Sequence, residues 1–209
     1  MKKLLVVLAV LIGAVVIGAM WFVGARNRLV TLDEKVQQSW AQVENVYQRR
    51  ADLIPNLVAT VKGVANFEQE TLTKVVEARA QATQISGDAL KNAVNDPQAF
   101  EKFQASQGAL SSALSRLLVV VERYPELKAN QNFLELQAQL EGTENRIAVE
   151  RRRFNETAQE FNTAVRRFPG SLVASLAGFQ PKPYFKADPG AQQAPKVDFG
   201  GPDTTGQGP

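Results

Sequence analysis

The sequence predicts an all-α protein with an N-terminal transmembrane helix, an antiparallel up-down bundle of long helices and an extended C-terminal tail. Residues 4–23 form an uncharged apolar run, apolar residues recur at helical spacing from Leu29 to Phe168, and proline and glycine dominate from Gln180 onward. No stretch of the body alternates as a strand would. The chain therefore divides into a membrane anchor, a helical bundle and a Pro/Gly-rich extended or disordered tail, over residues 1–25, 26–179 and 180–209.

The first segment is long enough to cross a membrane. Its twenty residues, at about 1.5 Å each, span roughly 30 Å, the thickness of a bilayer's hydrocarbon core. A cleaved signal peptide is the alternative, because two lysines precede the run and small residues follow it. The run, however, exceeds the roughly 7–15 apolar residues of a signal peptide. We favour an anchor that contacts membrane lipid through residues 4–23, with Trp21 and Phe22 at the membrane interface.

Positive charges on the two sides of the anchor nearly balance. Two lysines precede it, and Arg26 and Arg28 follow it, so the positive-inside rule gives little preference. The short segment before the apolar run favours a cytoplasmic N-terminus and a domain on the outer side of the membrane. Within the anchor, Ala14 and Gly18 form a small-xxx-small pair, which permits close approach of two membrane helices.

One heptad phase predicts the first long helix of the bundle. The phase consists of Leu29, Val36, Val43, Arg50, Leu57 and Val64. Pro55 interrupts this stretch, and proline inside a helix removes a hydrogen bond and bends or breaks the helix. The phase is nevertheless the same on both sides of Pro55, which a loop would have no reason to preserve. We expect one kinked helix from about Leu29 to Gln84, with no reversal of direction at Pro55.

The second long helix is bounded by two prolines. It opens at Asp96-Pro97, a capping residue followed by proline at the first helical position, where a missing N–H is tolerated. It closes before Tyr124-Pro125. Its apolar stripe is Phe100, Phe103, Gln107, Leu110, Leu114, Leu117 and Val121.

The third long helix carries the most regular stripe, which predicts a seam against neighbouring helices. Asn130 is expected to cap it, and the helix then runs from Gln131 to Arg167 and stops at Pro169-Gly170. A short helix over Ser171–Ala177 can follow. The stripe residues, seven apart, are Phe133, Leu140, Ile147, Phe154, Phe161 and Phe168.

The most chemically interesting cluster inside the helical pattern is formed by Arg50, Asp52, Pro55 and Asn56, because Arg50 occupies a position that the heptad would make apolar. A kink frees backbone carbonyl groups that need hydrogen-bond donors. Arg50 or Asn56 could supply those donors, which gives the cluster a structural role. The alternative is a functional one, in which the bend at Pro55 shapes a groove for a partner protein.

Two charged residues of the third helix also take positions in the apolar pattern. These are Glu144 and Arg151. Together with Arg50 they could form a buried polar layer, which can fix the register of packed helices at some cost in stability. We hypothesise that Arg50 meets Glu144 inside the bundle.

The composition gives no support to catalysis. The chain contains no histidine and no cysteine, which removes the commonest metal ligands, the usual general base and the cysteine nucleophile. There is no glycine-rich phosphate loop. An oxygen-only site for Mg²⁺ or Ca²⁺ is conceivable but has no distinct motif. We expect neither an enzyme nor a cofactor.

The third helix is rich in arginine, but it does not predict a nucleic-acid site. Between Gln131 and Arg167 there are six glutamates and six arginines, and the whole chain has 24 basic and 21 acidic residues. A solvated, salt-bridged helix surface is the favoured interpretation. Binding of anionic lipid headgroups or nucleic acid is the alternative, but the arginines are not interleaved with an aromatic platform of the kind that single-strand binding requires.

Four apolar residues stand out in the tail: Tyr184, Phe185, Val197 and Phe199. They could dock the tail along the bundle or add a strand to another chain. A flexible tail without contacts is the alternative.

Several short motifs follow one another along the chain. Upstream, these segments are Ala41-Gln42-Val43 and Arg49–Val58 with Val61-Lys62-Gly63. Downstream, they are Tyr124–Asn130, Thr143–Ile147, Phe154-Asn155, Phe161-Asn162, Phe168-Pro169, Pro183-Tyr184-Phe185 and Pro195–Phe199. In this order and spacing they resemble the LemA family, and the resemblance extends from the membrane segment to Phe199.

The resemblance implies a bacterial single-span protein of the inner membrane with a helical-bundle domain and no established enzymatic activity. With the orientation above, the domain would lie on the periplasmic or extracytoplasmic side. We expect a scaffold or assembly protein that acts through protein–protein contacts, with self-association, a possible envelope partner and no nucleic acid. The alternative is a regulatory or adaptor subunit of a membrane enzyme or protease system.

Overall fold

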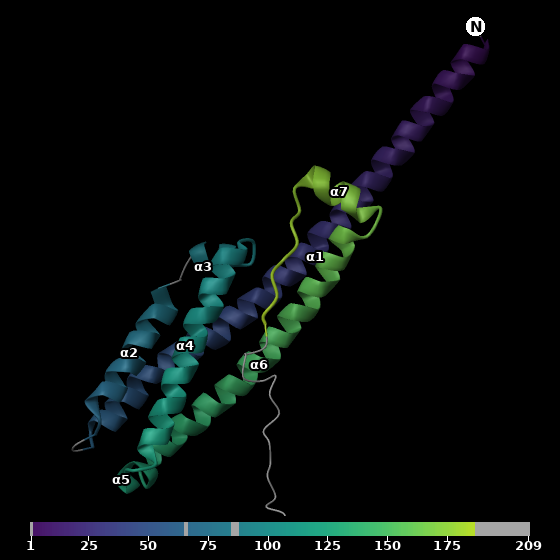
Figure 1. Ribbon diagram of the computed structural model, residues 1–209. Helices are drawn as coiled ribbons and strands as arrows, with labels where there is room; N and C mark the ends of the chain where they lie inside the picture. Colours follow the sequence, from purple (N-terminus) through teal and green to yellow (C-terminus); the bar gives the residue numbers. More distant parts are fainter. Residues whose placement is uncertain (1, 65–66, 85–87, 187–209) are drawn as a thin grey trace, which may run out of the picture.

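The computed structural model describes residues 2–64, 67–84 and 88–186, and 86% of these residues are helical with no strand among them. The all-α prediction is confirmed. The helices, labelled in Figure 1, are α1 (Lys2–Lys62), α2 (Gln69–Gln84), α3 (Asp88–Ala93), α4 (Pro97–Val121), α5 (Pro125–Lys128), α6 (Gln131–Arg166) and α7 (Gly170–Ala177).

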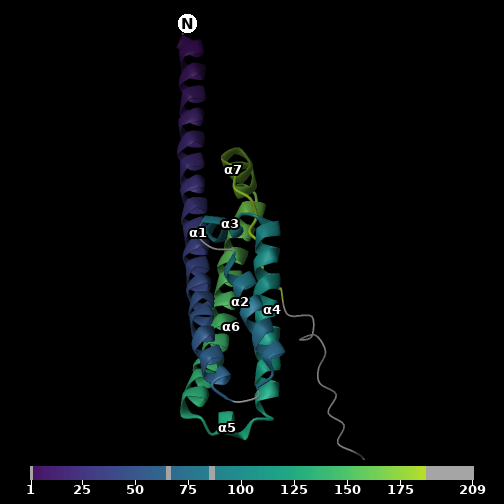
Figure 2. The same cartoon turned by 90° about the vertical axis from the view of Figure 1, so that its left-hand side faces the viewer.

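The anchor and the first helix of the domain are one continuous helix, α1. Its N-terminal part is apolar and long enough to cross a membrane, and that window has no buried residues. Figure 2 shows this part extending well beyond the other helices. From Leu29 to Val61 the same helix buries one side against the domain. The domain therefore joins the anchor through rigid helix, with no intervening loop.

The expected helix from Leu29 to Gln84 is wrong in its second half. The helix does pass through Pro55 without reversing, but α1 ends at Lys62 and α2 starts at Gln69. Gly63 follows α1 directly, and glycine costs about 1 kcal/mol more than alanine inside a helix. After the break, the Phe67 ring packs against Tyr124 at 4.8 Å between centroids, which holds the connecting segment against the far end of α4.

The start of each of the other two long helices was placed correctly from the sequence. Asp96 Oδ1 accepts hydrogen bonds from the backbone nitrogens of Gln98 and Ala99, at 2.8 and 3.2 Å, and Pro97 is the first residue of α4. Asn130 Oδ1 accepts from the Phe133 nitrogen at 3.2 Å and caps α6. Side-chain caps of this kind satisfy N–H groups that have no partner in the first turn. The short helix expected over Ser171–Ala177 is α7.

The main packing partners are α1 with α6 and α2 with α4. α1 and α6 run in opposite directions, since Lys35 lies 3.7 Å from Glu160 and Arg50 lies 2.7 Å from Glu144. Buried apolar residues form two separate clusters along this long domain. The proximal core, nearer the anchor, is centred on Trp40. The distal core is lined by α1 residues from Ile54 to Val61 and by parts of α2, α4 and α6.

The proximal core is strongly aromatic. Trp40 packs against Phe103 at 5.3 Å and Phe154 at 5.4 Å between ring centroids, and its indole nitrogen donates to the Leu90 carbonyl oxygen at 3.1 Å. Phe185, from beyond α7, completes the group at 4.7 Å from Phe100. Aromatic pairs at these separations add about 0.5–1.5 kcal/mol each beyond the burial of their area.

Candidate functional site

A charged side chain separates the proximal and distal cores. Arg50 is 1% exposed and lies on α1 between Tyr47, the last α1 residue of the proximal core, and Ile54, the first of the distal core. Its Nη1 donates to Ser111 Oγ and to Glu144 Oε1, both at 2.7 Å. The guanidinium also lies over the Tyr47 ring, 5.0 Å from its centroid.

The layer around Arg50 connects four helices. Arg50 Nη2 donates to the Gln107 side-chain oxygen at 2.5 Å and to the Gln107 backbone oxygen at 3.2 Å. Gln107 Nε2 in turn donates to the Ala82 carbonyl oxygen of α2 at 3.1 Å. We call Arg50, Gln107, Ser111 and Glu144 the polar layer. Because buried polar groups are costly unless paired, this layer specifies how α1, α2, α4 and α6 align.

The salt bridge hypothesised between Arg50 and Glu144 is present, but at the edge of the domain and not deep inside it. The Glu144 side chain is 43% exposed, whereas that of Arg50 is 1% exposed. The carboxylate thus keeps part of its hydration while it compensates a buried charge, which lowers the desolvation cost of the pair.

Arg151 was expected in this layer and is not there. It lies two turns further along α6, where its Nη2 donates to the Lys186 carbonyl oxygen at 2.7 Å. Its guanidinium covers the Phe185 ring at 4.9 Å from the centroid. The heptad spacing correctly placed Arg151 on a packed side of α6, but the segment packed there is the tail. Sequence spacing alone does not show which segment packs against a given turn of a helix.

The carbonyl group left free by Pro55 is that of Ala51, and its donor is neither Arg50 nor Asn56. Arg79 of α2 donates through Nε to the Ala51 oxygen at 2.8 Å. The Asn56 backbone oxygen accepts from Thr60 Oγ1 at 2.9 Å. The sequence interpretation missed Arg79, because it placed this residue on the same continuous helix as Pro55.

Apart from Arg50, the residues of the predicted cluster around Pro55 lie at the surface. Asp52, Pro55 and Asn56 are exposed, and Asp52 Oδ1 accepts from Gln48 Nε2 at 2.8 Å within the same helix surface. Their side chains are accessible to a partner, whereas Arg50 is enclosed by the polar layer.

Two asparagines of α6 hold the chain that follows α7. Asn162 accepts from the Lys182 backbone nitrogen at 2.7 Å and donates to the Lys182 carbonyl oxygen at 2.9 Å. Asn155, two turns away, makes the same pair of bonds to Phe185, at 2.9 and 3.0 Å. Each side-chain amide therefore makes with one tail residue the two backbone hydrogen bonds that a neighbouring β-strand would make. We call residues 180–186 the docked segment.

Lys182 is a buried cation in the docked segment and links three parts of the fold. It is 8% exposed, its Nζ lies 2.6 Å from Asp33 Oδ1 of α1, and the same atom donates to Asn95 Oδ1 before α4. It also lies over the Phe161 ring at 5.1 Å. The sequence interpretation missed Lys182. The repeated Phe-Asn pairs, seven residues apart on α6, were the only signal of this contact.

The tail therefore belongs partly to the domain. Phe185 is 6% exposed within the proximal core, while Tyr184 is 37% exposed. The boundary expected at residue 180 between bundle and tail separates Phe185 from the core residues against which it packs. Val197 and Phe199 lie outside the described residues.

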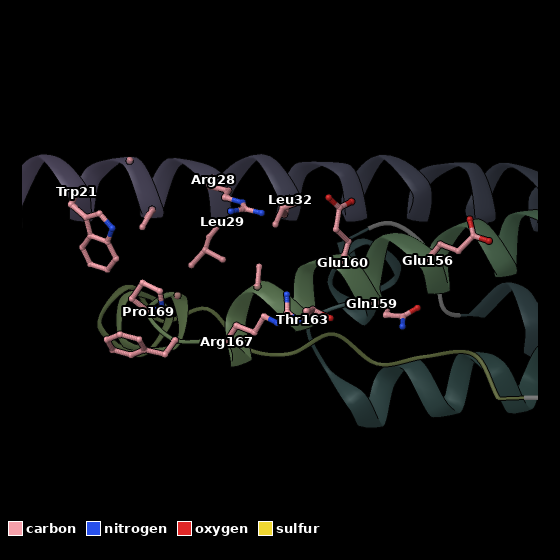
Figure 3. A pocket seen from close by; sticks show the side chains of 15 residues that line it. Trp21, Arg28, Leu29, Leu32, Glu156, Gln159, Glu160, Thr163, Arg167 and Pro169 are labelled. Carbon is pink, nitrogen blue, oxygen red and sulfur yellow. The ribbon is translucent and has the colours of Figure 1, made fainter.

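A groove of about 920 Å³ opens where the anchor enters the domain (Figure 3). Its α1 wall includes Trp21 and Arg28, and its other wall includes Thr163, Arg167 and Pro169 near the end of α6. Trp21 is 45% exposed, and its place at a membrane interface stays a prediction. Its neighbour Phe22 instead packs partly against the proximal core.

The described part of the chain contains no group of three or more acidic, histidine or cysteine residues that could hold a metal ion. Polar side chains of the layer are engaged with one another, and its central member is an arginine, which does not act as a base at ordinary pH. The contacts that Arg50 makes in the polar layer are contacts between α1, α4 and α6.

Comparison with known proteins agrees with the motifs. Residues 39–199 match the LemA family. The magnetosome protein MamQ of Magnetospirillum gryphiswaldense is 27% identical over an alignment of 177 residues that covers 78% of this chain and 65% of the relative. A protein LemA of Metamycoplasma hominis is 25% identical over 153 residues, 73% of this chain and 65% of the relative. The chain thus spans somewhat less than two thirds of the length of these relatives.

Proposed function

The chain belongs to the LemA family, and from this membership and the structure we propose a membrane-anchored, non-enzymatic scaffold that assembles through protein–protein contacts. The observation that carries the proposal is the continuity of α1. One helix is both the apolar segment and the first helix of the domain. An antiparallel up-down bundle built on that helix would stand out from the membrane and offer its sides to other molecules.

Relatives support a membrane-associated and non-catalytic role. Their names, magnetosome protein MamQ and LemA, do not describe an enzymatic activity. In the described residues of this chain, the buried cations Arg50 and Lys182 form internal salt bridges, Arg50 with Glu144 and Lys182 with Asp33. Buried charges in catalytic sites are instead poised toward a cavity that holds substrate.

Exposed apolar side chains on the domain fit a scaffold. Val119 of α4 is 70% exposed and Leu134 of α6 is 43% exposed. A groove of about 380 Å³ lies between α4 and α6, with Leu118 and Leu140 among its lining residues and Glu144 of the polar layer at its edge. Self-association through such surfaces is our leading proposal, and a separate envelope protein is a second possible partner.

The proposal is tested by co-expressing two tagged versions of the full chain in one cell and solubilising the membrane in mild detergent. A scaffold made of its own copies predicts that each tag recovers the other at stoichiometric level. The alternative, a regulatory or adaptor subunit of a membrane enzyme or protease system, predicts a different protein at stoichiometric level and no second copy. Recovery of a single copy alone would contradict both.

We propose that the anchor lies in a bacterial inner membrane with the domain on the periplasmic or extracytoplasmic side. The absence of cysteine allows a single-site test. Ser112 is exposed on α4, and Ser112→Cys should react with an impermeant maleimide added to intact spheroplasts. A label that appears only after lysis would place the domain in the cytoplasm.

A further inference from the structure

Helix α7 leaves one of its sides uncovered. Val173 and Ala174 are 0% and 2% exposed and pack into the proximal core. Leu172 and Leu176 lie one turn apart on a different side and are 54% and 69% exposed. Phe168 lies between the end of α6 and the start of α7 and is 84% exposed. Clustered large apolar side chains at the surface mark an interaction site.

The uncovered side is at the end of the domain from which the anchor leaves. Both views place α7 at this end, beside α1 (Figures 1 and 2). The groove of Figure 3 lies between the two elements, because Trp21 and Gly24 of α1 line it together with Phe168, Pro169 and Gly170, the first residue of α7. Phe168 and the start of α7 therefore lie at the level of Trp21, near the end of the apolar run.

Four arginines lie at this end of the domain, with Glu156 and Glu160 further along the same groove. Arg26 and Arg28 follow the apolar run on α1, and Arg166 and Arg167 end α6, and all four are exposed. Arginine near a membrane surface is attracted to anionic headgroups. Exposed apolar side chains next to basic residues are typical of a helix that lies in the membrane interface.

We propose that Phe168 and the Leu172–Leu176 side of α7 form a second membrane contact, inserted into the headgroup region of the bilayer that holds the anchor. The occupant of this surface is lipid, with the four arginines on anionic headgroups. The inference rests on the membrane anchoring of the proposed function. It implies that the domain is held at two points, α1 and α7, and keeps a fixed orientation toward the bilayer.

The test uses the full chain with one introduced cysteine at a time, labelled with an environment-sensitive fluorophore. The three positions are Leu172→Cys on α7, Val15→Cys in the apolar run and Val119→Cys on α4. Val119 is a matched control because it is an exposed apolar residue, at 70%, on another helix. The proteins are reconstituted in phosphatidylcholine–phosphatidylglycerol vesicles that carry a nitroxide quencher near either the carbonyl or the methyl end of the acyl chain.

The proposal predicts quenching at Leu172 at least about twofold stronger than at Val119, and stronger with the shallow quencher, since interfacial helices insert only about 5–10 Å. Val15 should be quenched more by the deep probe. A Leu172 label that is unquenched and open to aqueous iodide overturns the proposal while leaving the anchor intact. A Leu172 label shielded from iodide but not quenched by lipid indicates a protein neighbour and also overturns it. An unquenched label at position 15 would contradict the membrane anchoring on which the proposal rests.

Discussion

The Arg79 guanidinium of α2 donates to the Ala51 carbonyl oxygen of α1 at 2.8 Å, and this is the carbonyl that Pro55 leaves without its helical N–H partner. Proline at this position would ordinarily cost about 3 kcal/mol in a helix interior. The bond from Arg79 offsets part of that cost and ties α2 to the turn before the proline. A residue that usually breaks a helix thus creates an acceptor for a neighbouring helix.

Arg79→Met should lower the free energy of unfolding by about 1–2 kcal/mol, because it leaves the buried Ala51 carbonyl unpaired. In a Pro55→Ala background the residue 55 N–H can pair with that carbonyl, so the same substitution should cost less than about 0.5 kcal/mol. Urea unfolding of all four proteins of this cycle measures the coupling. Equal costs in the two backgrounds would show that Arg79 acts independently of Pro55.

Removal of the Glu144 charge should destabilise the polar layer. Glu144→Gln leaves Arg50 buried without a counter-charge, and we expect a loss of about 2 kcal/mol, below the roughly 3–5 kcal/mol of a fully buried pair because this carboxylate is half exposed. Glu141→Gln, one turn away on the exposed surface of α6, is the matched control and should change stability little. A double substitution with Arg50→Met should cost less than the sum of the single changes. Additive losses would contradict a direct interaction between the two side chains.

Phe185 should contribute to stability as a core residue. Phe185→Ala removes a ring packed among Trp40, Phe100 and Phe154, and the expected loss in unfolding free energy is about 3 kcal/mol. Tyr184→Ala, at a more exposed position, should cost less than about 1 kcal/mol. Trp40 fluorescence in a Trp21→Phe background follows the transition. A Phe185→Ala protein as stable as Tyr184→Ala would mean that the docked segment does not pack on the domain in solution.

The Asn162 amide should control how tightly the docked segment is held. Asn162→Ala leaves both the N–H and the carbonyl group of buried Lys182 unpaired, which should cost about 2–4 kcal/mol in local opening free energy. Hydrogen exchange at the Lys182 amide measures this opening directly and should accelerate at least about thirtyfold. Asn155→Ala, at a partly exposed position, should accelerate exchange at Phe185 and have a smaller effect at Lys182. Unchanged exchange in Asn162→Ala would contradict the role assigned to this amide.

The anchor offers a separate test of self-association. A Cβ added at Gly18 would meet no other side chain or distant backbone atom within 4 Å, so we expect Gly18→Leu to leave the fold of this copy unchanged. If Ala14 and Gly18 allow two anchors to approach closely, Gly18→Leu should reduce dimer formation in membranes by about tenfold, equivalent to 1.4 kcal/mol. Val16→Leu, on another side of the helix, should leave dimerisation unchanged. Equal dimerisation of the two variants would exclude this pair of small residues as the contact.

Local signals in the sequence were sufficient for the helix starts. Asp96 and Asn130 cap the helices predicted for them, because a cap depends only on residues within one turn. Continuity through Pro55 also followed from an unbroken heptad phase. The same phase gave the wrong result beyond Lys62, because periodicity reports which side of a helix is apolar and not whether the chain has turned back.

Contacts between distant segments were harder to predict. Arg50 could be paired with Glu144 because both are charged residues at apolar heptad positions, and such exceptions need partners. Arg79, Lys182 and Asn162 occupy unremarkable positions, and their roles depend on which backbone groups another segment brings close. Those roles became visible only once the three-dimensional arrangement was known.

We propose that this chain is a membrane-bound scaffold of its own copies. The decisive measurement is the mass, by native mass spectrometry, of the complexes that the full chain forms in lipid nanodiscs. Self-assembly predicts complexes at integer multiples of 22.9 kDa that contain this protein alone and persist on dilution. A single 22.9 kDa species, or a stoichiometric complex with one different protein, would contradict it.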